Sequence, residues 1–146
     1  MPSAGQDIFA LNHQFAWRGV NDDELAITST SYTAGSVPCG VAFTVPDSGT
    51  VTLIWYAYYR INTSNQILIS AGVYSGAVIG SGSAISGSTD TRSLTSESSG
   101  DDRAGMAMRT IEGLTPQAVV HARIEARVTG GNGDILNREI LVIPHP

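Results

Sequence analysis

The run from Thr50 to Ile61 constrains the fold more than any other part of the chain, because it is apolar on both alternating faces. A β-strand turns successive side chains to opposite faces of its sheet, so alternate residues share a face. β-branched and aromatic residues dominate this run, and these residue types favour strands. One face carries Val51, Leu53, Trp55, Ala57, Tyr59 and Ile61, and the other carries Ile54, Tyr56 and Tyr58. The run predicts a long strand with one face in the core and a second face that also needs cover.

After residue 23 the chain repeats the strand pattern, with Gly, Ser, Thr, Asn and Pro at the breaks. In residues 118–128, apolar side chains are expected to face inward, and His121, Arg123, Glu125 and Arg127 are expected to face outward. The Gly/Ser-rich stretch 75–100 predicts short edge strands joined by long loops. Regular spacing of about eight strands predicts an all-β fold, an antiparallel jelly-roll β-sandwich. The strands are expected over 25–32, 37–45, 50–61, 66–74, 103–111, 118–128 and 135–143, with short ones within 75–100.

Residues 1–23 differ in character, because they mix apolar and polar residues without a strict period. We therefore predict a short N-terminal arm over 1–23, which serves as an attachment segment or a trimer clasp, and a β-sandwich domain over 24–146. The apolar residues of the arm are too few to build a core, and aromatic side chains left in solvent promote aggregation. They are expected to dock either back on the sandwich or on another protein. We predict the second, with Phe9, Leu11, Phe15 and Trp17 as the attachment residues.

Charge and hydropathy exclude two classes of partner. The net charge is −5, and the eight cationic residues are all arginines scattered along the chain, which argues against a surface that follows phosphates. No apolar run approaches the ~20 residues that span a bilayer. Neither nucleic acid nor membrane is therefore expected as a partner. The N-terminus lacks the basic region of a secretory signal, so the chain is expected to be made in a cytoplasm.

The sequence holds no motif typical of catalysis or metal binding. His13, His121 and His145 lie far apart in the sequence, and Cys39, expected to be buried, is the only cysteine. The acidic clusters at 22–24 and 101–102 are typical of solvated turns. We predict no catalytic residue, no metal and no cofactor. A glycan hydrolase stays open only if two of the acids in 90–102 flank a cleft.

Two patterns resemble known families. Residues 41–51 (VAFTVPDSGTV), followed by the aromatic run, resemble the entry into trimeric jelly rolls of the C1q/TNF-like type. A second set of motifs is similar to small virion proteins of actinobacterial tailed phages, of the minor tail or decoration type. This set comprises GLTP at 113–116, ARVTGGNG at 126–133, REILVIP at 138–144 and the opening AGQD at 4–7.

The resemblance implies a structural protein of a virion that is assembled in the host cytoplasm. Together with the doubly apolar run, it predicts a non-enzymatic homotrimer on the virion exterior, a capsid decoration protein held by the major capsid or tail protein. Tyr56 and Tyr58 are the predicted subunit-interface residues, since aromatic residues are enriched at such contacts. One alternative is a minor tail or tail-tip subunit. Another is a carbohydrate-binding module in which Tyr56, Tyr58 or Tyr74 stacks on a host-surface glycan.

Overall fold

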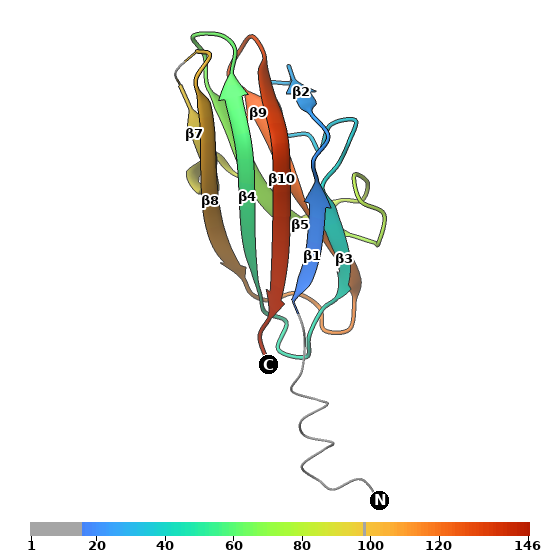
Figure 1. The fold of residues 1–146 in the computed structure, drawn as a ribbon. Coiled ribbons are helices and arrows are strands. Elements are labelled where there is room, and N and C mark those ends of the chain that lie inside the picture. The colour runs from blue at the N-terminus through green and yellow to red at the C-terminus, as the bar shows by residue number, and fades with distance from the viewer. Residues whose placement is uncertain (1–15, 98) are drawn as a thin grey trace, which may run out of the picture.

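The computed structural model describes residues 16–97 and 99–146, which form ten strands in two antiparallel sheets packed face to face (Figure 1). Sheet A contains β1 (Trp17–Asn21), β2 (Leu25–Ile27), β4 (Val51–Ile61), β8 (Asp102–Ile111) and β10 (Gly133–Pro144). Sheet B contains β3 (Gly40–Thr44), β5 (Ile67–Ser75), β6 (Ala84–Ser86), β7 (Leu94–Ser96) and β9 (Val119–Val128). The predicted all-β sandwich is confirmed, with ten strands where about eight were expected.

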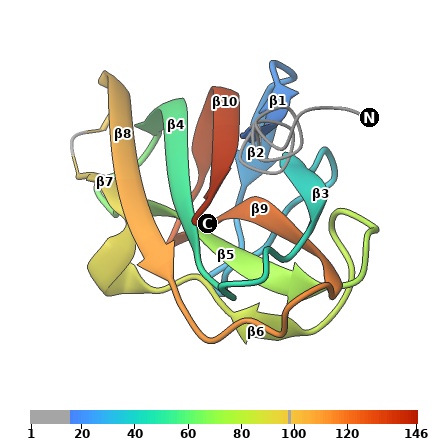
Figure 2. The ribbon, with the colours of Figure 1, turned by 90° about the horizontal axis from the view of Figure 1, so that it is seen from below.

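The chain passes from one sheet to the other, so strands distant in sequence become neighbours. Sheet A has the order β1-β10-β4-β8, with β2 also paired to β10, and Figure 1 shows these strands side by side. Sheet B has the order β3-β9-β5-β6, with β7 also paired to β5. Figure 2 shows the two sheets as separate layers. Strand β8 is therefore a long edge strand of sheet A.

The core lies between the two sheets and contains the inward row of β4, as the alternation predicted. Val51, Leu53, Trp55, Ala57, Tyr59 and Ile61 are each no more than 4% exposed. The inward residues of β9 face them from sheet B and are also buried. Cys39 is buried in the same cluster, as expected.

Strand β1 differs from the predicted division of the chain into an arm and a domain. Residues 17–21, which the sequence placed in the arm, pair antiparallel with residues 138–142 of β10. The inward positions of this short strand are Trp17 and Gly19, whereas Val20 faces solvent. This pattern is not the usual apolar-inward alternation, so the strand was not recognised. Residues 1–15 lie outside the described residues.

The outward row of β9 is buried, which corrects the expectation that its charged residues face solvent. His121, Arg123 and Glu125 point away from the core but are at most 8% exposed. The Gly/Ser-rich segment after β5 crosses over them, and its carbonyl groups contact His121 and Arg123. The short 3₁₀ turn η1 (Asp90–Arg92) ends this crossing. Within the described ranges, no helix is long and apolar enough to cross a membrane.

Candidate functional site

The outer face of sheet A carries a row of apolar side chains that no other part of the described chain covers. Met106 and Met108 on β8 are 70% and 66% exposed, and Tyr56 on β4 is 38% exposed. Exposed apolar patches on proteins are often sites of interaction, so this face is the candidate site. The apolar residues of the outer face are Val20, Ile54, Tyr56, Tyr58, Met106, Met108, Leu141 and Ile143.

Strand register brings these side chains together. Tyr56 lies opposite Met106 of β8 on one side and Glu139 of β10 on the other. Ile54 lies in the same way between Met108 and Leu141. Directly opposed residues on one face of an antiparallel pair have neighbouring side chains. They enclose a shallow hollow of about 270 Å³, lined by Ile54, Tyr56, Met106, Glu139 and Leu141.

Glu139, the charged residue beside Tyr56 in the hollow, is paired within the chain. The Arg18 guanidinium donates to the Glu139 carboxylate, with an Nε–Oε1 distance of 2.5 Å. This hydrogen bond and the positive charge of Arg18 hold the pKa of Glu139 below its usual range. Glu139 is therefore ionised and already neutralised, so the hollow combines four uncharged side chains with one carboxylate that has its partner in Arg18.

Tyr58 is held in place at the other end of the row. Its hydroxyl donates to Asp102 Oδ2 at 2.8 Å, and this hydrogen bond raises the pKa of the phenol. Asp102 also lies 3.7 Å from Arg60, so the carboxylate has a positive partner. Tyr58 is half-buried along β4 and presents its ring on the same face as Tyr56. The structure thus places the two predicted interface tyrosines on one uncovered surface.

The predicted attachment residues are not found together in the described part of the chain. Trp17 is half-buried in the sandwich, and its ring centroid lies 5.2 Å from that of Phe43. Phe9, Leu11 and Phe15 lie outside the described residues. The alternative sugar-stacking residue Tyr74 is 4% exposed, with the Arg123 guanidinium 3.6 Å above its ring. Tyr74 therefore offers no face to a glycan, which corrects that reading.

Sequence reasoning missed Met106 and Met108, the most exposed members of the outer face. In β8 the outward row holds these two methionines, whereas the inward row holds Gly105, Ala107 and Arg109. A charged residue on the inward row and methionines on the outward row reverse the usual pattern of a half-buried strand. The pairing of Met106 with Tyr56 identifies these methionines as part of the outer face, and this pairing is known only from the folded structure.

The two histidines within the described residues, His121 and His145, lie apart and make separate contacts. His121 Nδ1 lies 2.9 Å from the Gly76 carbonyl oxygen, whereas His145 Nε2 lies 2.8 Å from Thr52 Oγ1 on the other sheet. Among residues 16–97 and 99–146, no group of three or more His, Cys, Asp or Glu side chains is placed to hold a metal ion.

Several solved structures of one viral protein share this fold. A mutant VP2 protein of infectious bursal disease virus, in derived T=1 particles, superimposes with a TM-score of 0.55 at 9% identity over 91% of this chain. The VP2 subviral particle of the same virus gives 0.54 at 10% identity over 92%. This chain spans about a third of those VP2 chains, 32% and 33% of their length. At such identity the likeness shows a shared fold alone.

A tumour necrosis factor protein, Eiger from S. frugiperda, matches at a TM-score of 0.44 and 10% identity, over 90% of this chain and 94% of its own. No protein-family model matches the sequence. The search of curated proteins returns no match either.

Proposed function

We propose that this protein is a non-enzymatic structural component on the exterior of a tailed-phage virion, a homotrimeric capsid decoration protein. Its subunits associate through the outer face of sheet A. The observation that carries this proposal is the uncovered group of apolar side chains on β10, β4 and β8, in which Ile54 lies between Leu141 and Met108, and Tyr56 lies beside Met106. A minor tail or tail-tip subunit is the alternative within the same class, because it would use the same surface.

The composition of the outer face supports burial between subunits. Tyr and Met are enriched in protein interfaces, and charged residues are depleted at interface centres. Tyr56, Ile54 and the two methionines form such a centre, and Glu139, which adjoins Tyr56, is neutralised by Arg18 of the neighbouring strand β1. The C1q/TNF-like resemblance of residues 41–51 favours three subunits over two.

The shared fold of VP2 supports the virion role. VP2 of infectious bursal disease virus is found in T=1 and subviral particles, so a sandwich of this architecture is compatible with a repeated position on a shell. The motifs at 113–116, 126–133 and 138–144 favour a tailed phage as the source of the virion. We assign attachment to the major capsid or tail protein to Phe9, Leu11 and Phe15, since Trp17 packs within the sandwich.

The test of the proposal is the oligomeric state of the chain and its dependence on the outer face. Light scattering on the purified protein is expected to give about three times the chain mass of 15.3 kDa. The double variant Tyr56→Glu, Met106→Glu is expected to become monomeric and keep its strand content, because it places two charges in the interface centre. A wild-type monomer at micromolar concentration would contradict the proposal.

The matched control is Val78→Glu, which adds a charge to a residue that is 68% exposed on the segment covering sheet B. This variant is expected to remain trimeric. If Val78→Glu dissociates the oligomer and the double variant does not, the association surface lies on sheet B and the assignment of the outer face is wrong.

A further inference from the structure

Among residues 16–97 and 99–146, the edge strand β8 pairs with β4 alone, and its other side has no partner strand. It is ten residues long, whereas the edge strands β1, β3 and β6 have five, five and three residues. Proteins usually protect a long edge with lysine, proline or a bulge. Strand β8 has none of these, and its inward Arg109 is turned to the Ala71 carbonyl oxygen of sheet B. The edge can therefore accept a further strand.

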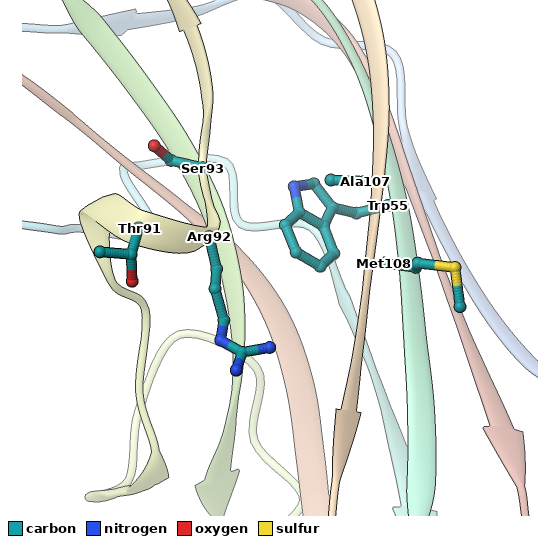
Figure 3. Close-up of a pocket in the computed structure, with 6 residues that line it drawn as sticks. All are labelled: Trp55, Thr91, Arg92, Ser93, Ala107 and Met108. Carbon is teal, nitrogen blue, oxygen red and sulfur yellow. The ribbon is translucent and has the colours of Figure 1, made fainter.

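The elements that approach β8 from the other layer do not occupy this edge. Strand β7 pairs with β5 and so belongs to sheet B. The turn η1 is also held by sheet B, because Ser70 Oγ of β5 donates to the Arg92 carbonyl oxygen at 2.8 Å. A cavity of about 460 Å³ separates η1 from β8, and Figure 3 shows Ala107 directed toward Trp55 across it and Met108 directed away. A strand added beyond β8 would thus continue sheet A, of which β8 is the last strand (Figure 2).

Hydrogen bonds at the two ends of β4 show which main-chain groups of β8 face the free edge. His145 N donates to the Thr50 carbonyl oxygen at 3.0 Å on the β10 side, and Gly100 N donates to the Ile61 carbonyl oxygen at 2.8 Å on the β8 side. Because these directions alternate along a strand, the odd-numbered residues of β4 bond to β8, and they lie opposite the odd-numbered residues of β8. The even-numbered residues of β8 therefore direct their N–H and C=O groups to the free edge. They are Asp102, Ala104, Met106, Met108 and Thr110.

We propose that β8 pairs antiparallel with β8 of a second copy across a twofold axis, so that two copies of sheet A form one continuous sheet. The residues with free main-chain groups are also the outward row of β8, which includes the exposed Met106 and Met108. One contact thus satisfies the free N–H and C=O groups and covers the methionine side chains. The pairing uses the main chain, whereas the association proposed above uses side chains of the outer face, so neither contact depends on the other.

Side-chain direction and charge restrict the register of this pairing. Directly opposed residues of an antiparallel pair lie on the same face of the sheet, so an outward residue must oppose an outward residue. The two registers that overlap β8 most are centred on Met106 and on Ala107. The register centred on Met106 places Arg103 opposite Arg109 of the second copy, and directly opposed like charges are destabilising.

The register centred on Ala107 has no such conflict. Arg109 then lies opposite Gly105 of the second copy, and Ala107 lies opposite its own counterpart. Met106 of each copy lies opposite Met108 of the other, so the methionines of both copies meet on the outer face. Methionine side chains are flexible and fill irregular contacts. This register accounts for two methionines on the outward row of an edge strand.

Disulfide trapping on a Cys39→Ala background tests the register. Ala107→Cys brings the two residues of a pair to about 4.5 Å between Cα atoms, which suits a disulfide. Met106→Cys is the matched control, because its thiol would lie opposite Met108 and not opposite its own counterpart. A single strand pair is a small contact, so we expect it to be transient in dilute solution and to be trapped by oxidised glutathione.

We expect Ala107→Cys to form a covalent dimer about ten-fold faster than Met106→Cys, although Met106 is the more exposed residue. Equal or faster cross-linking of Met106→Cys would overturn the proposal. Cross-linking at residue 107 in a protein that lacks the threefold mass would contradict the trimer and leave the edge pairing intact. A trimer that does not cross-link at residue 107 would overturn the edge pairing alone.

Proline at residue 104 tests the main-chain hydrogen bonds. Ala104→Pro removes an N–H group that faces the free edge and leaves the hydrogen bonds with β4 in place. We expect it to slow cross-linking of Ala107→Cys by about ten-fold, whereas Ala104→Ser is expected to leave the rate unchanged. Undiminished cross-linking in the proline variant would overturn the proposal. The comparison of the two cysteine variants is decisive even if Ala104→Pro fails to fold.

Discussion

Gly19 of β1 and Gly40 of β3 bring the backbones of the two sheets into direct contact at one edge of the sandwich. A Cβ atom on Gly19 would overlap the carbonyl oxygen of Gly40, and a Cβ atom on Gly40 would overlap that of Ala122. Neither glycine has a positive φ, so both are required for space and not for backbone conformation. Trp17 and Phe43 extend the same contact with their rings. Strand β1 is therefore an integral part of the sandwich.

Gly19→Ala is expected to lower the free energy of unfolding by about 1–3 kcal/mol, the usual cost of overpacking a tight interior. The cost arises because the obstacle is backbone, which cannot rotate away as a side chain does. Urea denaturation measures it. Gly87→Ala is the control, because its added Cβ would meet the Ala84 Cβ at 3.4 Å and the Tyr74 hydroxyl at 3.8 Å, which are ordinary van der Waals contacts. Equal losses in the two variants would show that the inter-sheet contact does not limit packing.

The core of sheet A could be predicted from the sequence, because one row of the run 50–61 is apolar throughout, whereas the other row also contains Thr52 and Arg60. The inward row of β4 and its outward tyrosines are placed as expected. Strands β1 and β8 could not be predicted in the same way. Each has an inward glycine and an outward apolar residue, namely Val20 in β1 and Met106 in β8. The inward glycine of β1 is explained by the close approach of the other sheet, and the outward apolar residues belong to the uncovered outer face of sheet A. Both features depend on the folded structure and not on the local sequence.

The buried charges on β9 illustrate a second limit. Alternation predicts which side of the sheet Arg123 and Glu125 face, and that side is as expected. Whether that side is exposed to solvent depends on the path of the Gly/Ser-rich segment. The composition of this segment is compatible both with a linker and with a packed cover. In the folded protein, Tyr74, His121 and Arg123 pack against one another beneath this segment, so the segment is a packed cover. The sequence offers no periodic signal for such a cover.

Glu125→Ala is expected to destabilise the protein by about 3–5 kcal/mol, because it leaves the Arg123 charge buried without its partner. Arg123 Nη2 lies 2.7 Å from Glu125 Oε1, and the two side chains are only 10% and 7% exposed. Tyr74 also donates its hydroxyl to Glu125. Tyr74→Phe removes only that neutral donor and is expected to cost about 1 kcal/mol.

The double variant Arg123→Met, Glu125→Leu provides the control for this cost. It removes both charges and keeps the volume, so chemical denaturation should show a smaller loss than for Glu125→Ala alone. A double variant that is less stable than Glu125→Ala would mean that the ion pair itself stabilises the fold, beyond avoiding an unpaired charge.

Cys39 is expected to make the protein sensitive to alkaline pH. Burial raises the pKa of its thiol from the ordinary 9.0 to about 11. The folded state therefore holds the proton more tightly than the unfolded state. This contribution, about 3 kcal/mol, is fully present below pH 9 and is lost as the pH rises toward 11. The free energy of unfolding of wild type and of Cys39→Ala is measured by denaturation between pH 8 and 11. The difference between the two isolates the contribution of Cys39, because the tyrosines ionise in both proteins.

The stability difference between wild type and Cys39→Ala should shrink across that range, because only the wild type must bury or protonate a thiolate. A constant difference would mean that the thiol ionises freely in the folded state. The same burial predicts that iodoacetamide modifies Cys39 at the rate of unfolding in the native protein and quickly in denaturant.

Truncation from the N-terminus separates attachment from folding. Deletion of residues 1–15 retains all ten strands that the structure describes, so the melting temperature is expected to stay close to that of the full chain. Deletion of residues 1–21 removes β1, exposes the edge of β10 and strips Trp17 from Phe43. We expect this second deletion to lower the free energy of unfolding by about 3 kcal/mol or more, since it removes a packed tryptophan.

Binding of the shorter deletion to particles that lack the protein then tests the attachment residues. If Phe9, Leu11 and Phe15 hold the sandwich on the shell, the protein without residues 1–15 folds and trimerises but no longer co-sediments with those particles. Restoring residues 1–15 with Phe9, Leu11 and Phe15 replaced by serine is expected to leave binding lost, because the apolar contacts and not the length of the segment provide the affinity. Full binding by the shorter deletion would place the attachment surface on the sandwich itself, and the uncovered outer face of sheet A would then contact the shell rather than another subunit.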